Sequence, residues 1–250
     1  MNKLNINQEL DIIEKRKNNI SLDDLKKEFN IKSDKTIYDI HKRNGREHLI
    51  PNKKYDCNSD YFKEINSEDK AYWLGFLYAD GYVRMKDNRS GELKLKLKKS
   101  DREHIELFNK YLSSNYPIKD LISKVKVDDK IYVSECSSLS IYNTKLVKDL
   151  FNHGCLNNKT FKIKIPDLKN NMIRHFIRGY FDGDGCIYKH PNGSSAECNI
   201  TSNLDFITNI FNYLKYGRII KHGKVFGLRF YHKKNIEKFY HLIYEESTIF

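Results

Sequence analysis

The chain has 250 residues, which is room for one large domain or two small ones. Its hydrophobic content of 39% is enough for a core, but no apolar run approaches the ~18 residues of a membrane span, which excludes an integral membrane protein. The net charge of +12 is typical of a polyanion binder, although RNA, membrane lipid or plain solubility would also fit it. Five cysteines without metal-ligand spacing predict reduced thiols and no zinc.

The first 50 residues are predicted to form a small helix-turn-helix-like module. Residues 7–17 have helical periodicity, Ser21 is placed to cap a second helix, and residues 35–43 form a third. In this plan the last helix enters the major groove of DNA, and its surface candidates are Lys35, Tyr38 and Lys42. The alternative is a three-helix appendage that binds nothing, which agrees with 13 basic against 11 acidic side chains over residues 1–60.

A duplicated motif follows a linker predicted at residues 51–66. Residues 73–81 and 177–185 both run from aromatic and aliphatic residues into a terminal Asp-Gly, 104 positions apart. Each copy carries small residues four apart, which would let two such helices touch backbone to backbone. These small residues are Gly75 with Ala79, and Gly179 with Gly183. Each helix is expected to end at Gly81 or Gly185 in a left-handed cap.

Two acids are predicted to meet where these helices end. If the helices pack side by side and parallel, Asp80 and Asp184 become neighbours beside two helix C-termini. Carboxylates, the last-turn carbonyls of Ala79 and Gly183 and the negative ends of two helix dipoles all favour a hard cation such as Mg²⁺. One copy alone would be consistent with an ordinary amphipathic helix, but duplication favours the metal site.

A lysine-rich strand follows the first motif. Strands are predicted at 82–86 and 92–99 around a turn at 87–91, and residues 93–98 alternate strictly between leucine and lysine. Leucines then face a core, and the opposite face carries Lys94, Lys96 and Lys98, with Arg84 and Lys86 if the hairpin is in register. Such a face suits phosphate contacts, and a merely solvated strand face is the alternative.

The same plan recurs in both halves of the remaining chain. The first half continues with a helix at 101–112, strands near 121–127 and 130–141, and a helix at 143–151. In the second half, strands are predicted at 186–190 and 196–201 across Pro191-Asn192-Gly193, then a helix at 204–214, strands at 218–221 and 225–231, and a helix near Ile236. The predicted repeats are 67–151 and 171–250, joined by a linker at 152–170. Each is α-β-β-α-β-β-α, so two antiparallel sheets should lie beneath the paired helices.

At its two Asp-Gly motifs the chain resembles the LAGLIDADG homing endonucleases in their single-chain, two-motif form. The resemblance implies an α+β fold in which the duplicated unit makes a DNA-binding saddle. By position, Asp80 and Asp184 fall on the family's metal-binding acids, and Gly75 and Gly179 on its helix-interface glycine. The family's earlier acid is replaced by Tyr78 in the first motif, whereas Asp182 keeps it in the second.

The activity that the resemblance implies is site-specific cleavage of double-stranded DNA. The enzyme would be a Mg²⁺-dependent endonuclease with two or three divalent ions shared by Asp80 and Asp184, leaving short 3′ overhangs. Its partner would be a long pseudo-palindromic DNA target. A monomer in the cytoplasm, associated with the nucleoid, is expected.

Further site residues are carried by the resemblance or by the strand pattern. Lys99 matches a basic residue of the family that acts near the scissile phosphate, and Thr201-Ser202-Asn203 lacks a lysine there, so the two strands would be cut at unequal rates. Lys159 resembles a linker lysine of the family, with a solvated surface role as the alternative. Candidates for contacts to base edges are Arg84, Tyr188, His190 and Arg229.

The rival hypothesis is a non-cleaving nucleic-acid binder with the same fold, either an intron maturase or a transcription regulator. Retention of Asp80 and Asp184 argues against the regulator but not against a maturase. A nuclease embedded in an intein is disfavoured, because the sequence from Met1 to Phe250 shows neither the nucleophile nor the terminal His-Asn of splicing chemistry.

Overall fold

The structure is a computed structural model that describes residues 4–18, 20–45, 55–86, 90–128, 130–156, 162–189 and 196–249, without the side chains of 125–127, 130 and 132. It divides into two compact units, Met1–Tyr55 and Asp56–Phe250, which are treated separately below. Among the described residues, no helix is both long and apolar enough to cross a membrane.

The first unit consists of three short helices. They are α1 (Ile6–Lys17), α2 (Leu22–Glu28) and α3 (Asp34–Arg43). Each begins at a polar residue whose side chain accepts a hydrogen bond from the first turn, namely Asn5, Ser21 and Ser33. The small core contains six buried residues: Ile12, Ile13, Leu25, Ile31, Ile37 and Ile40. The N-terminal helices predicted from the sequence are confirmed.

The second unit repeats one order of elements twice, which confirms the duplicated α+β fold. The first repeat is α4 (Glu68–Ala79), β1 (Gly81–Lys86), β2 (Ser90–Lys98), a short 3₁₀ turn η1 (Lys99–Asp101), α5 (Arg102–Tyr111), β3 (Ile118–Val127), β4 (Lys130–Tyr142) and α6 (Thr144–Asn152). The second is α7 (Asn170–Asp184), β5 (Gly185–Lys189), β6 (Ala196–Ser202), α8 (Leu204–Leu214), β7 (Arg218–His222), β8 (Val225–Tyr231) and α9 (Lys233–Tyr244).

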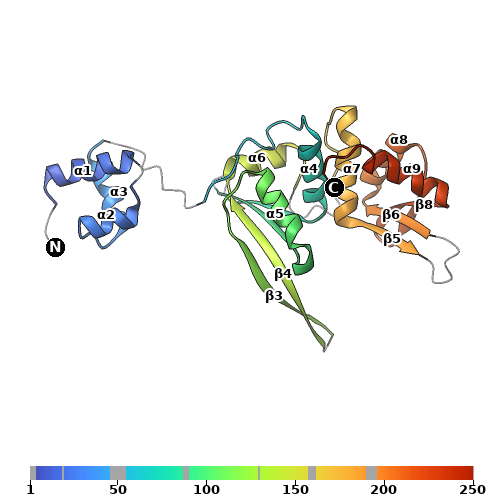
Figure 1. The fold of residues 1–250 in the computed structure, drawn as a ribbon, viewed down its shortest axis with the longest axis horizontal. Helices are drawn as coiled ribbons and strands as arrows, with labels where there is room; N and C mark the ends of the chain where they lie inside the picture. Colours follow the sequence, from blue (N-terminus) through green and yellow to red (C-terminus); the bar gives the residue numbers. More distant parts are fainter. Residues whose placement is uncertain are drawn as a thin grey trace. The chain divides into compact units, whose positions relative to one another are not determined.

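Each repeat builds a four-stranded antiparallel sheet. The strand orders are β1-β2-β4-β3 and β5-β6-β8-β7, so the two sheets have the same topology. Helices α5 and α6 pack on the first sheet, and α8 and α9 on the second. The motif helices α4 and α7 lie side by side between the two repeats (Figure 1). One continuous core therefore runs through both halves.

The two repeats differ in the length of one hairpin. Only Cys136–Tyr142 of β4 pairs with β2, and the preceding part of β4 pairs with β3 alone. This two-stranded ribbon projects beyond the first sheet (Figure 1). Among the described elements, no helix covers its outer part, and Ile122, Ile131 and Val133 are exposed there. β3 begins at Ile118, three residues earlier than the sequence pattern suggested.

The second half of the predicted linker is part of the second unit. Residues 56–66 carry Tyr61 and Phe62, and both side chains are buried in the core of that unit. Residues 46–54, which include the rest of the predicted linker before Tyr55, lie outside the described residues. So do residues 87–89 of the turn predicted at 87–91 and the whole turn predicted at Pro191-Asn192-Gly193. Between the repeats, α6 ends at Asn152 and α7 begins at Asn170.

The motif helices touch backbone to backbone at two glycines. A Cβ atom added at Gly75 would lie 2.0 Å from the carbonyl oxygen of Phe176, and one at Gly179 would lie 1.9 Å from that of Tyr72. Near the helix ends, a Cβ at Gly183 would lie 2.4 Å from the Cβ of Ala79. These separations are far below van der Waals contact, so the stripe of small residues fixes how closely the helices approach.

The left-handed cap expected at the end of each motif helix is wrong. Asp80 caps α4 with φ −99° and ψ −11°, and Gly185 follows α7 with φ −73° and ψ 155°. Glycine is instead required by crowding, because a Cβ at Gly81 would lie 2.6 Å from the carbonyl oxygen of Leu77. At Gly185 it would lie 2.3 Å from the carbonyl oxygen of Phe181. The chain can therefore turn directly from each helix into a strand.

Replacing Gly179 by alanine should destabilise the second unit by about 3 kcal/mol or more, since the methyl group must push two backbones apart. Thermal or urea unfolding would measure this change. Gly227→Ala is the matched control, because a Cβ there would meet nothing closer than 3.6 Å. Equal stability of the two variants would contradict the helix contact described above.

Candidate nucleic-acid interface and metal-binding acids

Asp80 and Asp184 come from the ends of the two motif helices. Asp80 is the C-cap of α4, and Asp184 is the last residue of α7. A Cβ placed on Gly183 would lie 3.2 Å from Oδ2 of Asp80, so this carboxylate lies against the last turn of α7. Both acids are exposed to solvent. The helix packing thus brings the first acid to the end of the helix that carries the second.

The donor set at this point is small and made of oxygen. Among the described residues, no group of three or more His, Cys, Asp or Glu side chains is placed to hold a metal ion. Two exposed carboxylates and last-turn carbonyls still suit Mg²⁺, which keeps several waters and is commonly bound by one or two carboxylates together with substrate phosphates. The residues present therefore fit a site that water and phosphate oxygens complete.

An open hollow with a volume of about 440 Å³ lies beside Asp80. Its other lining residues are Tyr82, Glu92, Lys94 and Lys96. Tyr82 follows Gly81, the residue after Asp80, and lies directly opposite Lys94 in the sheet. Two lysines from β2 therefore share a solvent-filled surface with the first motif acid.

Lys99 does not line this hollow. It begins the 3₁₀ turn η1, and its Nζ lies 3.0 Å from Oε2 of Glu135. The hydrogen bond to Glu135 raises the pKa of Lys99 above its usual value. Cys136 is opposite Lys98 and so lies on the lysine-bearing side of the sheet, and the neighbouring Glu135 belongs to the other side. The structure thus directs Lys99 away from the lysines of β2.

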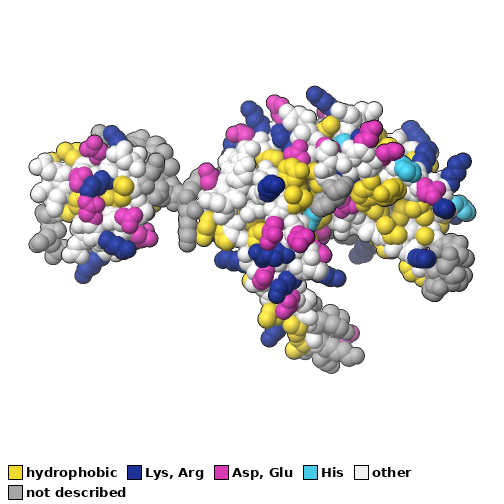
Figure 2. All heavy atoms as spheres, in the orientation of Figure 1, with side chains coloured by type: hydrophobic (Ala, Val, Ile, Leu, Met, Phe, Trp, Pro, Cys, Tyr) yellow, Lys and Arg dark blue, Asp and Glu magenta, His cyan; other side chains and the backbone are white. Residues whose placement is uncertain are grey.

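The predicted lysine face of the first sheet is formed in register. Leu93 and Leu95 are buried, whereas Lys94 is partly exposed and Lys96 and Lys98 are exposed. Arg84 is opposite Glu92 and Lys86 is opposite Ser90, so both cations lie on this side of the sheet. Lys119 is opposite Ser138, which is opposite Lys96, so Lys119 lies on the same side. The repeat-1 face, as it is called below, contains Arg84, Lys86, Glu92, Lys94, Lys96, Lys98 and Lys119. Figure 2 shows the opposite side, which carries α5 and where basic and acidic side chains are mixed.

The corresponding surface of the second sheet is less basic. In one row across the strands, Cys186 is opposite Asn199, which is opposite Arg229, which is opposite Arg218. In the next row Tyr188 is opposite Glu197. The repeat-2 face consists of Cys186, Tyr188, Glu197, Asn199, Thr201, Arg218, His222, Arg229 and Tyr231. His190 and Lys159, two further candidates, lie outside the described residues.

In the N-terminal unit the three candidate DNA contacts lie on one helix face. Lys35, Tyr38 and Lys42 are three and four positions apart in α3, and all three are exposed. The helix is anchored from its other side by Ile37 and Ile40, which are fully buried. This arrangement leaves the face available to a partner.

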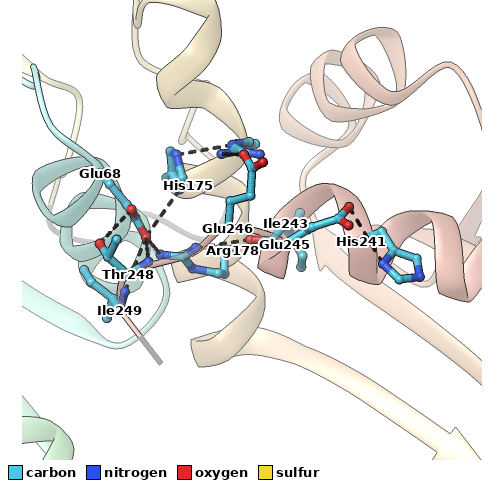
Figure 3. Close-up of polar contacts among 10 residues, drawn as sticks. Glu68, His175, Arg178, His241, Ile243, Glu245, Glu246, Thr248 and Ile249 are labelled. Carbon is cyan, nitrogen blue, oxygen red and sulfur yellow. Dashed lines mark hydrogen bonds and ion pairs between the residues drawn. The ribbon is translucent and has the colours of Figure 1, made fainter.

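A buried ion pair missed by the sequence analysis joins the two repeats (Figure 3). Arg178 of α7 is fully buried and donates to Oε1 of Glu68, the first residue of α4, over 2.8 Å. The same carboxylate accepts hydrogen bonds of 2.8 Å from the backbone N–H and the hydroxyl of Thr248. Burial acts to raise the pKa of Glu68, but these hydrogen bonds outweigh it and hold the pKa at about 2. The signal in the sequence was an arginine inside an apolar helix.

Asp182, the retained earlier acid, has a structural environment of its own. Its Oδ2 accepts a 3.0 Å hydrogen bond from the hydroxyl of Tyr72, and its Oδ1 accepts one from Tyr244. Tyr72 belongs to α4, and Tyr244 ends α9. Asp182 therefore links three helices through its two tyrosine partners.

Comparison with known proteins agrees with this architecture. Residues 171–244 match the family model of the LAGLIDADG-like domain. The second unit has the LAGLIDADG fold. The match covers α7 with its Asp184, both strand pairs and α8 and α9, which are the elements that build the second half of the site.

The fold is shared with a solved structure. The homing endonuclease I-WcaI bound to its DNA recognition sequence superposes with a TM-score of 0.52 at 14% identity, covering 74% of this chain and 85% of that one. The N-terminal LAGLIDADG domain of WhiA gives a TM-score of 0.45 at 16% identity over 76% of this chain and 90% of its own.

One curated protein is similar in sequence over most of the chain. It is the replication factor C small subunit of Methanocaldococcus jannaschii, 26% identical over 198 residues, which are 76% of this chain. The chain spans 9% of the length of that relative.

The buried His175 should make the second unit sensitive to acid. Burial lowers the pKa of His175 from 6.5 to about 4, and only 6% of its side chain is exposed. Below pH 6.5 His175 therefore binds a proton in the unfolded chain but stays neutral in the folded chain. The free energy of unfolding falls as the pH falls from about 6.5 to about 4. His175 accounts for roughly 3 kcal/mol of this loss.

Denaturant unfolding at pH 7 and pH 4.5 measures this loss. His175→Gln should flatten the dependence, and exposed His241→Gln should leave it unchanged. Burial also lowers the pKa of His104 to about 4. Because His104 is present in both variants, each should retain part of the pH dependence of stability. An unchanged slope in His175→Gln would show that the ring does not stay neutral in the folded state.

Proposed function

We propose that the protein is a site-specific endonuclease that hydrolyses double-stranded DNA with Mg²⁺ held between Asp80 and Asp184. The observation that carries this proposal is the close approach of Asp80 to the last turn of α7, beside a surface with six basic side chains and one acidic one. The fold, shared with a DNA-bound homing endonuclease, supports it.

The residues divide into two roles under this proposal. Asp80 and Asp184 hold the divalent ion, which when bound activates a water and stabilises charge on the scissile phosphate. The basic side chains of the repeat-1 face neutralise phosphates of the duplex and so contribute salt-dependent affinity. In the N-terminal unit, α3 would extend the footprint through Lys35, Tyr38 and Lys42.

Replacing either acid should separate cleavage from binding. Asp80→Asn and Asp184→Asn each remove a charge but keep the size of the side chain, so the fold and DNA binding should survive. Cleavage should fall at least about 100-fold, as expected when a charge-stabilising group is lost. Binding without metal should be unchanged or tighter, because the carboxylates repel a nearby phosphate.

The measurement follows a supercoiled plasmid from nicked to linear form in Mg²⁺, with a target selected from a randomised library. Binding is followed in Ca²⁺. Asp182→Asn is the matched control, since its carboxylate is occupied by Tyr72 and Tyr244 and should matter much less. Linearisation by Asp184→Asn at the wild-type rate would reject the nuclease and favour the non-cleaving binder.

We propose that a lysine of β2, in place of Lys99, acts as the catalytic cation. Lys96 lines the hollow with Asp80, whereas Lys99 pairs with Glu135. We therefore expect Lys96→Ala to slow cleavage about tenfold or more at saturating enzyme, because charge develops on the phosphate in the transition state. Lys99→Ala should change both cleavage and binding less than about twofold, as an exposed ion pair contributes little.

Single-turnover cleavage and titration of a fluorescent duplex would compare these two variants. A larger loss of cleavage in Lys99→Ala than in Lys96→Ala would return the role to Lys99, as the family resemblance implied.

A further inference from the structure

The two sheets offer different chemistry to a bound duplex. The repeat-1 face has six cations against Glu92, and five of the six are lysines. Two of these lysines, Lys86 and Lys119, lie on the edge strands β1 and β3. The repeat-2 face has two arginines against Glu197. Aromatic side chains occur on both faces, since Tyr82 and Tyr142 lie among the cations of the first sheet, so the faces differ chiefly in their charged groups. Lysine is a hydrated point charge on a flexible stem, whereas arginine presents a rigid fork that matches two acceptors at once.

Arg229 is held in place from both sides. Its Nη2 hydrogen-bonds Nε2 of His222, and its Nη1 lies 3.7 Å from Oε1 of Glu197. The Arg229 side chain is 24% exposed and that of Glu197 is 17% exposed, so the pair is partly withdrawn from water but still reachable from the sheet surface. A guanidinium fixed in this way loses little freedom when it binds an acceptor.

The surroundings of Arg229 suit a base edge better than a phosphate. A phosphate beside Arg229 would also approach the Glu197 carboxylate and be repelled by it. A base pair edge offers acceptors and donors together: guanine accepts from an arginine fork through O6 and N7, and cytosine donates from N4 to a carboxylate. In the same row, Oδ1 of Asn199 accepts a 3.2 Å hydrogen bond from Thr201, which orients its amide.

Arg218 adds a further reason for an acceptor at this point. It is directly opposite Arg229 across the β7–β8 pair, and like charges in such positions are destabilising. Glu197 lies on β6, on the side of Arg229 away from Arg218, so it offsets the repulsion between the two arginines from that side alone. An acceptor-rich guanine edge would relieve it.

We propose that the repeat-2 face determines the base sequence of its half of the target, chiefly through Arg229 held by Glu197 and His222, whereas the repeat-1 face binds its half mainly through phosphates. This inference rests on the proposed function only in taking duplex DNA as the partner, and it does not require cleavage. The two halves of the target should then differ in information content, with the more selective half under β5–β8.

The test is binding selection from a randomised duplex library with the full chain in Ca²⁺. The base pair whose preference changes in Arg229→Ala marks the half of each selected site that lies on the repeat-2 face. We expect the marked half to be the more restricted one. Arg229→Ala should flatten the preference at one base pair by about 5- to 150-fold.

Two further variants distinguish base readout from simple charge. Arg229→Lys keeps the charge but not the fork, so it should lose the base preference while keeping most of the affinity. Lys94→Ala, the matched control on the repeat-1 face, should weaken all sequences alike and lower the salt slope by about one. Equal restriction in both halves, or an Arg229→Lys variant with the wild-type preference, would overturn the inference.

The outcomes separate this inference from the proposed nuclease. Selective binding in Ca²⁺ without cleavage in Mg²⁺ would reject the nuclease alone. Cleavage with two equally restricted halves would reject the unequal readout alone. Failure to bind any duplex would overturn both.

Discussion

The architecture of the second unit depends on how closely two helix backbones can approach. At Gly75 and Gly179 each helix presents bare backbone to a carbonyl oxygen of the other, and no larger residue fits there. Because the helices are parallel neighbours down to Gly183 and Ala79, their ends are brought together, and so are the acids that terminate them. The two sheets begin directly after these acids, so their placement on either side of the helix pair follows from the same contact.

The two sides of the helix pair are held by different forces. Tyr78 packs edge-on against Phe176 with ring centroids 5.0 Å apart, and the corresponding contact on the other side joins Asp182 to Tyr72 by a hydrogen bond. That polar side continues to Arg178, whose guanidinium lies 5.0 Å from the centre of the Tyr72 ring. A buried ion pair is weak evidence for stability, but its directional bonds favour one alignment of the helices over others. The pseudo-symmetric repeats thereby obtain a unique pairing.

Patterns with a short period were predictable from the sequence, whereas contacts between distant segments were not. The helix of residues 204–214 was predicted with its observed bounds, because its apolar period and its cap at Asn203 are both local. The Glu68 contact with Thr248 joins residues 180 positions apart, and no periodicity encodes it. Likewise, an arginine in an apolar helix signals an unusual site without indicating its partner.

The position of Lys99 at the end of β2 bears on the role proposed for it. Alternation along β2 places Lys94, Lys96 and Lys98 on one face, and extending the strand to residue 99, as the sequence suggested, would place Lys99 on the opposite face with the leucines. The strand instead ends at Lys98, and the 3₁₀ turn directs Lys99 toward Glu135.

Metal binding and DNA binding should be coupled if the protein acts as proposed. Asp80 and Asp184 are exposed, and no third acidic, histidine or cysteine ligand accompanies them within the described part of the chain. Two carboxylates alone leave most positions of an octahedral ion to water, so the protein by itself should hold Mg²⁺ weakly. A phosphate at the same point supplies further oxygens and is repelled by the carboxylates unless a cation lies between them. Each partner therefore favours the other, and the acids are spared the desolvation that a closed protein site would impose.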